Sequence, residues 1–228
     1  MLIYFVRHGH PNYRLNCLTE LGKKHAAAAA ERLRDAGIEK IYASTHGRAT
    51  ETAAYTANLL GLEIVPCEFI REISWKPLTD EPIPHNGHPW NIADAMAAEG
   101  ITLVDKDWKM KEPFSKSRLV ECVTVVEEGI DAFLADLGYV REGEYYRVTK
   151  EDEHKTIAIF SHAGSSSAAI AHMMNIPFIQ FCGYVHPDFT SISVLSLPNR
   201  IGETVIPRAI VLNDSRHIEG ITEEEEEQ

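Results

Sequence analysis

Short apolar runs alternate along the chain with longer segments of helical character. Aromatic and β-branched residues dominate these runs, which predict buried strands over Leu2–Val6, Ile38–Ser44, Glu63–Ile70, Thr156–Phe160, Ser191–Leu197 and Val205–Leu212. Alanine-rich or amphipathic stretches predict helices over residues 20–36, 47–60, 90–99, 117–137 and 165–174. Strands alternating with helices are typical of an α/β protein. The pattern predicts a three-layer αβα sandwich around a mostly parallel central sheet.

Local signals refine this prediction. Thr19 is a suitable N-cap for the first helix, and Gly61 is placed to end the second. Pro66 removes one backbone donor, which weakens the third strand or places it at a sheet edge. Glu142-Gly143 predicts the turn of a hairpin over Tyr139–Thr149.

The region between the third and fourth core strands is irregular. It is rich in proline near residues 74–90 and carries two of the three tryptophans there. Aromatic residues are unusual in disordered segments, so we expect an ordered lid or insertion over about 73–150. The length of 228 residues fits one domain, residues 1–222, followed by an acidic disordered tail over 223–228.

Charge and cysteine content narrow the classes of function. The net charge is −12, of which five charges belong to Glu223–Glu227. A chain this acidic is a poor candidate for binding nucleic acid or a membrane surface. Four cysteines lie at least fifty residues apart and do not have the spacing of a zinc site or a redox motif. We therefore expect free thiols in a reducing cytoplasm. No signal peptide or transmembrane segment is expected, and the oligomeric state stays open.

Three predicted strands end at polar groups. Arg7 and His8 follow the first strand, Arg48 follows the second, and His162 follows the strand over Thr156–Phe160. Sites in open α/β sheets lie beyond the carboxyl ends of strands, so these groups would converge if the strands are neighbours. Arginine suits phosphate oxygens, and a neutral imidazole is a nucleophile. The sequence therefore predicts a phosphoryl-transfer site.

Several motifs together resemble the histidine phosphatase superfamily, also called phosphoglycerate-mutase-like. The matching segments follow the family's order from residue 2 to 214 and are Arg7-His8-Gly9, Leu18-Thr19-Glu20-Leu21-Gly22, Ser44–Ala53, Arg71-Glu72-Ile73, Phe160–Gly164 and Val211–Asp214. The resemblance implies that His8 becomes phosphorylated and that Glu72 protonates the leaving oxygen. It also implies that the phosphoryl group is bound by Arg7, Arg48 and His162, with no metal and no other cofactor.

The chain departs from the family pattern after the nucleophile. His10 and Pro11 stand where the family usually has Glu or Gln followed by Thr or Ser, and the loop is shorter than in the mutases. Arg14 occupies the position of the phosphate-binding asparagine, which leaves Asn12 and Asn16 as alternatives.

The proton donor also has alternatives. Some relatives carry an aspartate directly after the second histidine, where this chain has Ala163. Asp80 and Glu81 are the other candidate carboxylates, and they lie in the proline-rich region.

The leading hypothesis is a phosphatase that hydrolyses a small phosphorylated metabolite through a phosphohistidine. A phosphoglycerate-type mutase is the nearest alternative, although the short loop offers less to hold an intermediate. His8-x-His10 after a strand also resembles the metal-binding start of an amidohydrolase-like hydrolase. A non-catalytic binder of a phosphorylated ligand is a further alternative.

Overall fold

A six-stranded sheet forms the centre of the protein. The computed structural model describes residues 1–222, and the tail predicted over 223–228 lies outside the described residues. The strand order is β11-β9-β1-β8-β4-β5. These strands cover β1 (Leu2–Arg7), β4 (Lys40–Ser44), β5 (Ile64–Cys67), β8 (Thr156–Ser161), β9 (Ile192–Ser196) and β11 (Arg208–Asp214). Strands β1, β8, β4 and β5 are parallel, whereas β9 runs antiparallel to both of its neighbours.

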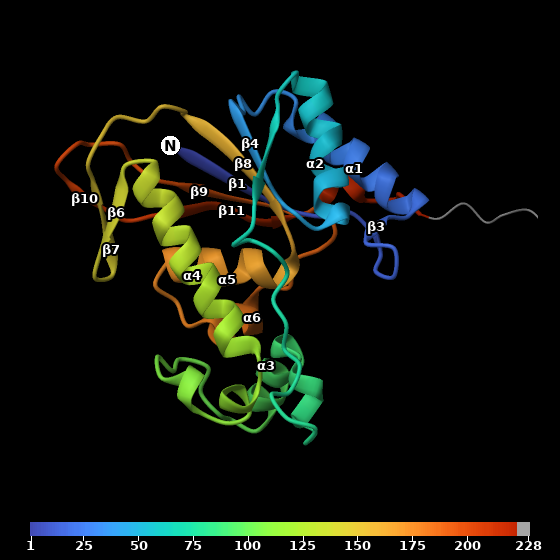
Figure 1. Ribbon diagram of the computed structural model, residues 1–228, viewed down its shortest axis with the longest axis vertical. Coiled ribbons are helices and arrows are strands. Elements are labelled where there is room, and N and C mark those ends of the chain that lie inside the picture. Colours follow the sequence, from blue (N-terminus) through green and yellow to red (C-terminus); the bar gives the residue numbers. More distant parts are fainter. Residues whose placement is uncertain (223–228) are drawn as a thin grey trace, which may run out of the picture.

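Helices cover both faces of this sheet (Figure 1). One face carries α1 (Glu20–Leu33) and α2 (Gly47–Leu60); the other carries α4 (Leu119–Asp136), α5 (Ala163–Met173) and α6 (Phe178–Tyr184). Successive side chains of a strand point to opposite faces. Ala158 and Phe160 of β8 accordingly enter the core under α1 and α2, while Ile157 and Ile159 enter the core under α4 and α5. The predicted three-layer αβα sandwich is confirmed.

The long connection between β5 and β8 contains the irregular part of the fold. It holds α3 (Pro89–Ala98) and three short 3₁₀ helices, η1 (Pro84–Gly87), η2 (Trp108–Met110) and η3 (Phe114–Lys116). Helix α3 packs on α6, and the connection then enters α4. The predicted hairpin is present as β6 (Tyr139–Glu142) and β7 (Tyr145–Val148). In Figure 1 the part of this connection around α3, drawn in green, lies below α6 at one end of the molecule.

Most of the predicted helices and strands are present, but some differ from the prediction. Thr19 caps α1 by accepting a hydrogen bond from the Gly22 N–H, and the strand that contains Pro66 lies at the sheet edge. The single strand predicted over Val205–Leu212 is wrong. Thr204–Val205 (β10) instead pairs with β7 in a separate small sheet, and β11 begins after Pro207. The pattern also missed α6, the short hairpin β2 (Pro11–Asn12) and β3 (Cys17–Leu18), and the final 3₁₀ helix η4 (Arg216–Ile218).

Candidate active site

The topology brings the predicted site residues to one edge of the sheet. Strand β8 lies between β1 and β4, and all three are parallel, so their carboxyl ends are adjacent. Arg7 and His8 therefore lie beside His162 and near Arg48 in the first turn of α2. Glu72 joins this group from the connection after β5. The structure places all five predicted residues together.

His8 is fixed as a neutral imidazole whose lone pair lies on Nε2. It is 1% exposed, and its Nδ1 lies 2.7 Å from the Gly9 carbonyl oxygen. A carbonyl only accepts hydrogen bonds, so Nδ1 carries the proton and Nε2 carries the lone pair. Burial lowers the pKa of His8 to about 3, helped by the positive charges of Arg7 and Arg48. At neutral pH the imidazole is therefore ready to act as a nucleophile through Nε2.

The turn after His8 depends on close backbone packing. A Cβ on Gly9 would lie 2.5 Å from the carbonyl oxygen of Gly22 in α1, which no larger residue tolerates without a backbone shift. The Gly9 N–H donates to Thr52 Oγ1 at 3.0 Å, and that hydroxyl donates to the Arg48 carbonyl at 2.7 Å. The turn is thus tied to α1 and α2, which holds the imidazole ring in place.

Arg48 faces His8 Nε2 directly. Its Nε donates to His8 Nε2 at 3.2 Å, and its Nη1 donates to Asn16 Oδ1 at 2.8 Å. Asn16 has a φ of 54°, a left-handed conformation that asparagine tolerates better than most residues. Of the two asparagines left open by the sequence, Asn16 is the one that reaches the site residues, whereas Asn12 accepts from the Leu15 N–H.

Arg7 is held by the segment that follows α6. Its Nη1 donates to the Pro187 carbonyl at 2.5 Å, and its Cζ lies 4.2 Å from the centre of the Phe189 ring. Its buried Nε has no hydrogen-bond partner among the described residues. Burial lowers the pKa of Arg7, although an arginine stays charged at neutral pH. The guanidinium therefore presents an unused donor next to His8.

His162 is fully buried between two polar neighbours. Its Nε2 lies 2.8 Å from Ser44 Oγ, and its ring centre lies 5.1 Å from that of His8. Nδ1 is buried without a partner among the described residues. Burial lowers the pKa of His162, so the ring is neutral. If the Ser44 hydroxyl donates to Nε2, the tautomer leaves an Nδ1–H to donate to an anion.

Glu72 sits at the N-terminus of α5 with one oxygen already occupied. Oε1 accepts from the Ile73 N–H at 3.0 Å and from the Ser165 N–H at 3.1 Å. Burial raises the pKa of this carboxyl, although both N–H donors and the nearby Arg7 and Arg48 charges oppose the rise. Oε2 takes neither of these bonds, so it is the oxygen that can carry a proton.

A sequence model of the histidine phosphatase superfamily (branch 1) matches residues 3–205. The chain belongs to this superfamily. Probable phosphoglycerate mutases of Yersinia pestis and Yersinia pseudotuberculosis are 33% identical over 90 residues, which is 36% of this chain and 42% of theirs. The chain therefore matches less than half the length of these curated relatives.

Solved structures share the superfamily fold across nearly the whole chain. A mycobacterial glucosyl-3-phosphoglycerate phosphatase is similar with a TM-score of 0.63 and 24% identity, over 93% of this chain and 98% of that one. The phosphoserine phosphatase of Entamoeba histolytica, a mutant bound to phosphoserine, gives a TM-score of 0.62 at 19% identity, over 95% and 98% of the chains. At these identities the likeness concerns the fold alone.

The hypothesis of an amidohydrolase-like barrel is wrong, because the sheet is open at β5 and β11 and belongs to this fold.

The structure adds site neighbours that the superfamily motifs did not single out. Ser44, Asn16 and Tyr13 contact the predicted residues, and Phe189 packs against Arg7. Ser44 belongs to the segment Ser44–Ala53 that resembles the superfamily, and the pairing of β4 with β8 brings it to His162. No sequence signal marked Phe189, which lies 181 positions after His8.

Among the described residues, no group of three His, Cys, Asp or Glu side chains is placed to hold a metal ion, and no helix could cross a membrane.

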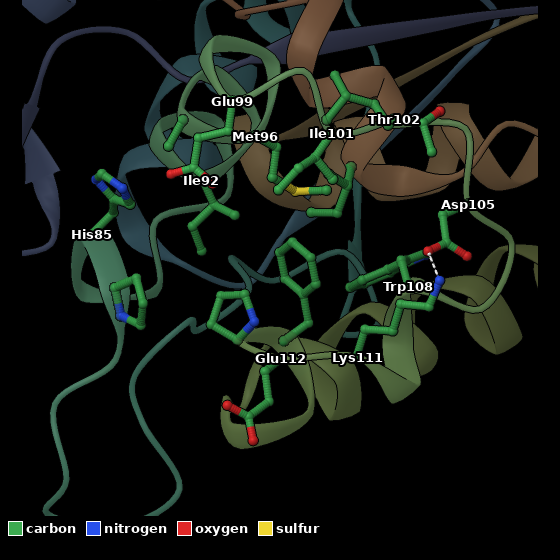
Figure 2. A pocket seen from close by; sticks show the side chains of 16 residues that line it. His85, Ile92, Met96, Glu99, Ile101, Thr102, Asp105, Trp108, Lys111 and Glu112 are labelled. Carbon is green, nitrogen blue, oxygen red and sulfur yellow. Dashed lines mark hydrogen bonds and ion pairs between the residues drawn. The ribbon is translucent and has the colours of Figure 1, made fainter.

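A separate cavity of about 340 Å³ lies in the connection between β5 and β8 (Figure 2). Its lining residues come mainly from α3, η2, η3 and the segments between them, and they include Ile92, Met96 and Trp108. Asp105 and Lys111 pair with each other at one side. None of the five predicted site residues lines it, so this cavity is distinct from the candidate active site.

Proposed function

We propose that this protein is a phosphatase that hydrolyses a small phosphate monoester through a phosphohistidine on His8. The observation that carries the proposal is the state of His8. Its proton is held on Nδ1 by the Gly9 carbonyl, and its Nε2 lone pair accepts a hydrogen bond from Arg48 Nε. If a phosphoryl group takes over this donor as it binds, the lone pair is left to attack phosphorus.

In the first step, the phosphoryl group is held by the donors of Arg7, Arg48 and His162. His8 Nε2 attacks phosphorus, and the bond between phosphorus and the ester oxygen breaks. The arginines balance the charge on the phosphoryl oxygens. Glu72 gives its proton to the departing oxygen, so the alcohol leaves neutral.

In the second step, water replaces the alcohol. The Glu72 carboxylate takes a proton from the water as its oxygen attacks phosphorus, and the bond between His8 Nε2 and phosphorus breaks. Inorganic phosphate leaves, and both residues return to their starting states. Glu72 must be protonated in the first step and ionised in the second, which fits a carboxyl whose pKa is raised by burial and moderated by nearby cations.

The proposal includes a small-molecule substrate and a cytoplasmic setting. Phosphatases on this fold include enzymes named for glucosyl-3-phosphoglycerate and phosphoserine, both small phosphorylated molecules. Four free cysteines fit a reducing compartment. A mutase is the second candidate because the curated relatives are named probable phosphoglycerate mutases. Conversion of 3-phosphoglycerate to its 2-phospho isomer, faster than phosphate release, would favour the mutase.

The test is to trap the intermediate during turnover. Purified protein is mixed with a panel of phosphate esters, quenched, and analysed for acid-labile phosphate on His8 by mass spectrometry. We expect phosphohistidine in the wild-type protein and none in His8→Ala, with His85→Ala as a control from the separate cavity. Phosphate on a serine, or normal turnover by His8→Ala, contradicts the mechanism. Phosphate binding without any turnover would indicate a non-catalytic binder.

A further inference from the structure

The loop between β2 and β3 places an aromatic side chain over the candidate active site. Tyr13 remains 66% exposed, yet its ring meets the His8 ring edge-on with the centroids 6.5 Å apart. The Cζ of Arg48 lies 5.4 Å from the centre of the same ring, and the Tyr13 hydroxyl interacts with the Arg7 guanidinium. One exposed residue therefore contacts three of the buried groups that form the phosphate site.

Hydrogen bonds on both sides of Tyr13 fix the loop in this position. Asn12 Oδ1 accepts from the Leu15 N–H at 3.1 Å, which closes the turn around Tyr13. Asn16 accepts from Arg48, and the Leu18 N–H donates to Glu51 Oε2 of α2 at 2.7 Å. The loop is therefore joined to α2, the helix that carries Arg48. The position of Tyr13 is a property of the site and not of a free surface loop.

A phenol hydroxyl can form hydrogen bonds with a cation or with an anion. It can accept a hydrogen bond from a guanidinium and can donate one to an anion. Tyr13 lies close enough to Arg7 to oppose the lowering of its pKa, and the positive charge of Arg7 would attract a phosphoryl group to the same place. Donation from a neutral hydroxyl to a phosphate oxygen is a charge-assisted hydrogen bond, which is stronger than a neutral one.

We propose that Tyr13 is a substrate-binding residue whose hydroxyl donates a hydrogen bond to the phosphoryl group held between Arg7 and Arg48. This inference rests on the proposed function for the identity of the anion. It adds a fourth hydrogen-bond donor to the phosphoryl group, after Arg7, Arg48 and His162, and that donor comes from a residue that no motif in the sequence marks.

The test compares Tyr13→Phe with the wild-type protein in binding inorganic phosphate, measured by titration calorimetry. The substitution removes the hydroxyl and keeps the ring over His8 and Arg48. We expect the affinity for phosphate to fall about tenfold or more, the usual consequence of losing a hydrogen bond to a charged group. Tyr145→Phe, an exposed tyrosine in the distant β6–β7 hairpin, should bind phosphate like the wild-type protein.

Other outcomes overturn the inference. Unchanged affinity in Tyr13→Phe would mean that the ring only covers the site. Tighter binding would mean that the hydroxyl competes with phosphate for Arg7 and blocks the empty site. Phosphate binding does not depend on turnover. If no phosphohistidine forms in the wild-type protein, the proposed function is refuted, but the phosphate affinities of Tyr13→Phe and wild type still test the role of Tyr13. A wild-type protein that binds no phosphate would refute both.

Discussion

The Glu72→Gln substitution tests the acid separately from the rest of the site. The glutamine amide oxygen can replace Oε1 as acceptor for the Ile73 and Ser165 N–H groups, so the local structure should be kept. What is lost is the ability to carry a proton on the other oxygen. Burial raises the pKa of Glu72, which favours the protonated form.

The expected loss depends on the leaving group. A general acid contributes roughly 10²–10⁴-fold, which is about 2.7–5.4 kcal/mol of barrier at 1.36 kcal/mol per tenfold. An alkyl phosphate needs this proton because an alkoxide is a poor leaving group. The p-nitrophenolate ion leaves without protonation. Glu72→Gln should therefore lose roughly 10²-fold or more on an alkyl phosphate and little on p-nitrophenyl phosphate.

The assay is steady-state kcat on both substrates, with the pH profile of each. Formation of the phosphohistidine requires protonated Glu72, so wild-type kcat on an alkyl phosphate should fall as pH rises through the pKa of this carboxyl. Glu63→Gln, an exposed carboxylate before β5, serves as the control. Equal losses on both substrates in Glu72→Gln would refute the reasoning. The acid would then be sought in Asp80 or Glu81, the alternatives in the connection.

Three further predictions concern the pocket and the stability of the fold. Arg48→Ala should weaken inhibition by vanadate ~10–100-fold, because a charged hydrogen-bonding partner contributes ~1.5–3 kcal/mol; unchanged inhibition would remove Arg48 from the phosphate site. Gly164→Ala should lower kcat on alkyl phosphates more than on p-nitrophenyl phosphate, because its Cβ would clash with Ile73 Cγ1, lie 2.7 Å from Glu72 Oε1 and so displace the carboxyl; equal kcat values in variant and wild type would contradict this close approach. His8 and His162 have lowered pKa values and stay neutral in the fold, whereas unfolded histidines gain protons below pH ~6.5. The free energy of unfolding, measured by urea titration, should therefore fall with decreasing pH from ~6.5, by up to ~1.4 kcal/mol per pH unit for each histidine; the same slope in His8→Ala would argue against this account for His8.

Sequence patterns alone predicted the alternating strands and helices and most of the residues at the site. The reason is that each buried strand needs a run of apolar residues, and each polar group at a strand end is visible as a break in that run. Arg7 and His8 after β1 and His162 after β8 are of this kind. The order of motifs added Glu72, which no periodicity marks.

Other features of the site required the tertiary structure. Neighbouring strands in the sheet are distant in sequence, so the pairing of β8 with both β1 and β4 is what brings His162, Ser44 and His8 together. The tautomer of His8 depends on one carbonyl distance, and the raised pKa of Glu72 depends on burial that only the fold creates. Tyr13 was invisible because a tyrosine in a short polar loop has no distinctive pattern. Sequence periodicity reports which side chains are buried, whereas hydrogen-bond geometry and desolvation exist only once distant segments meet.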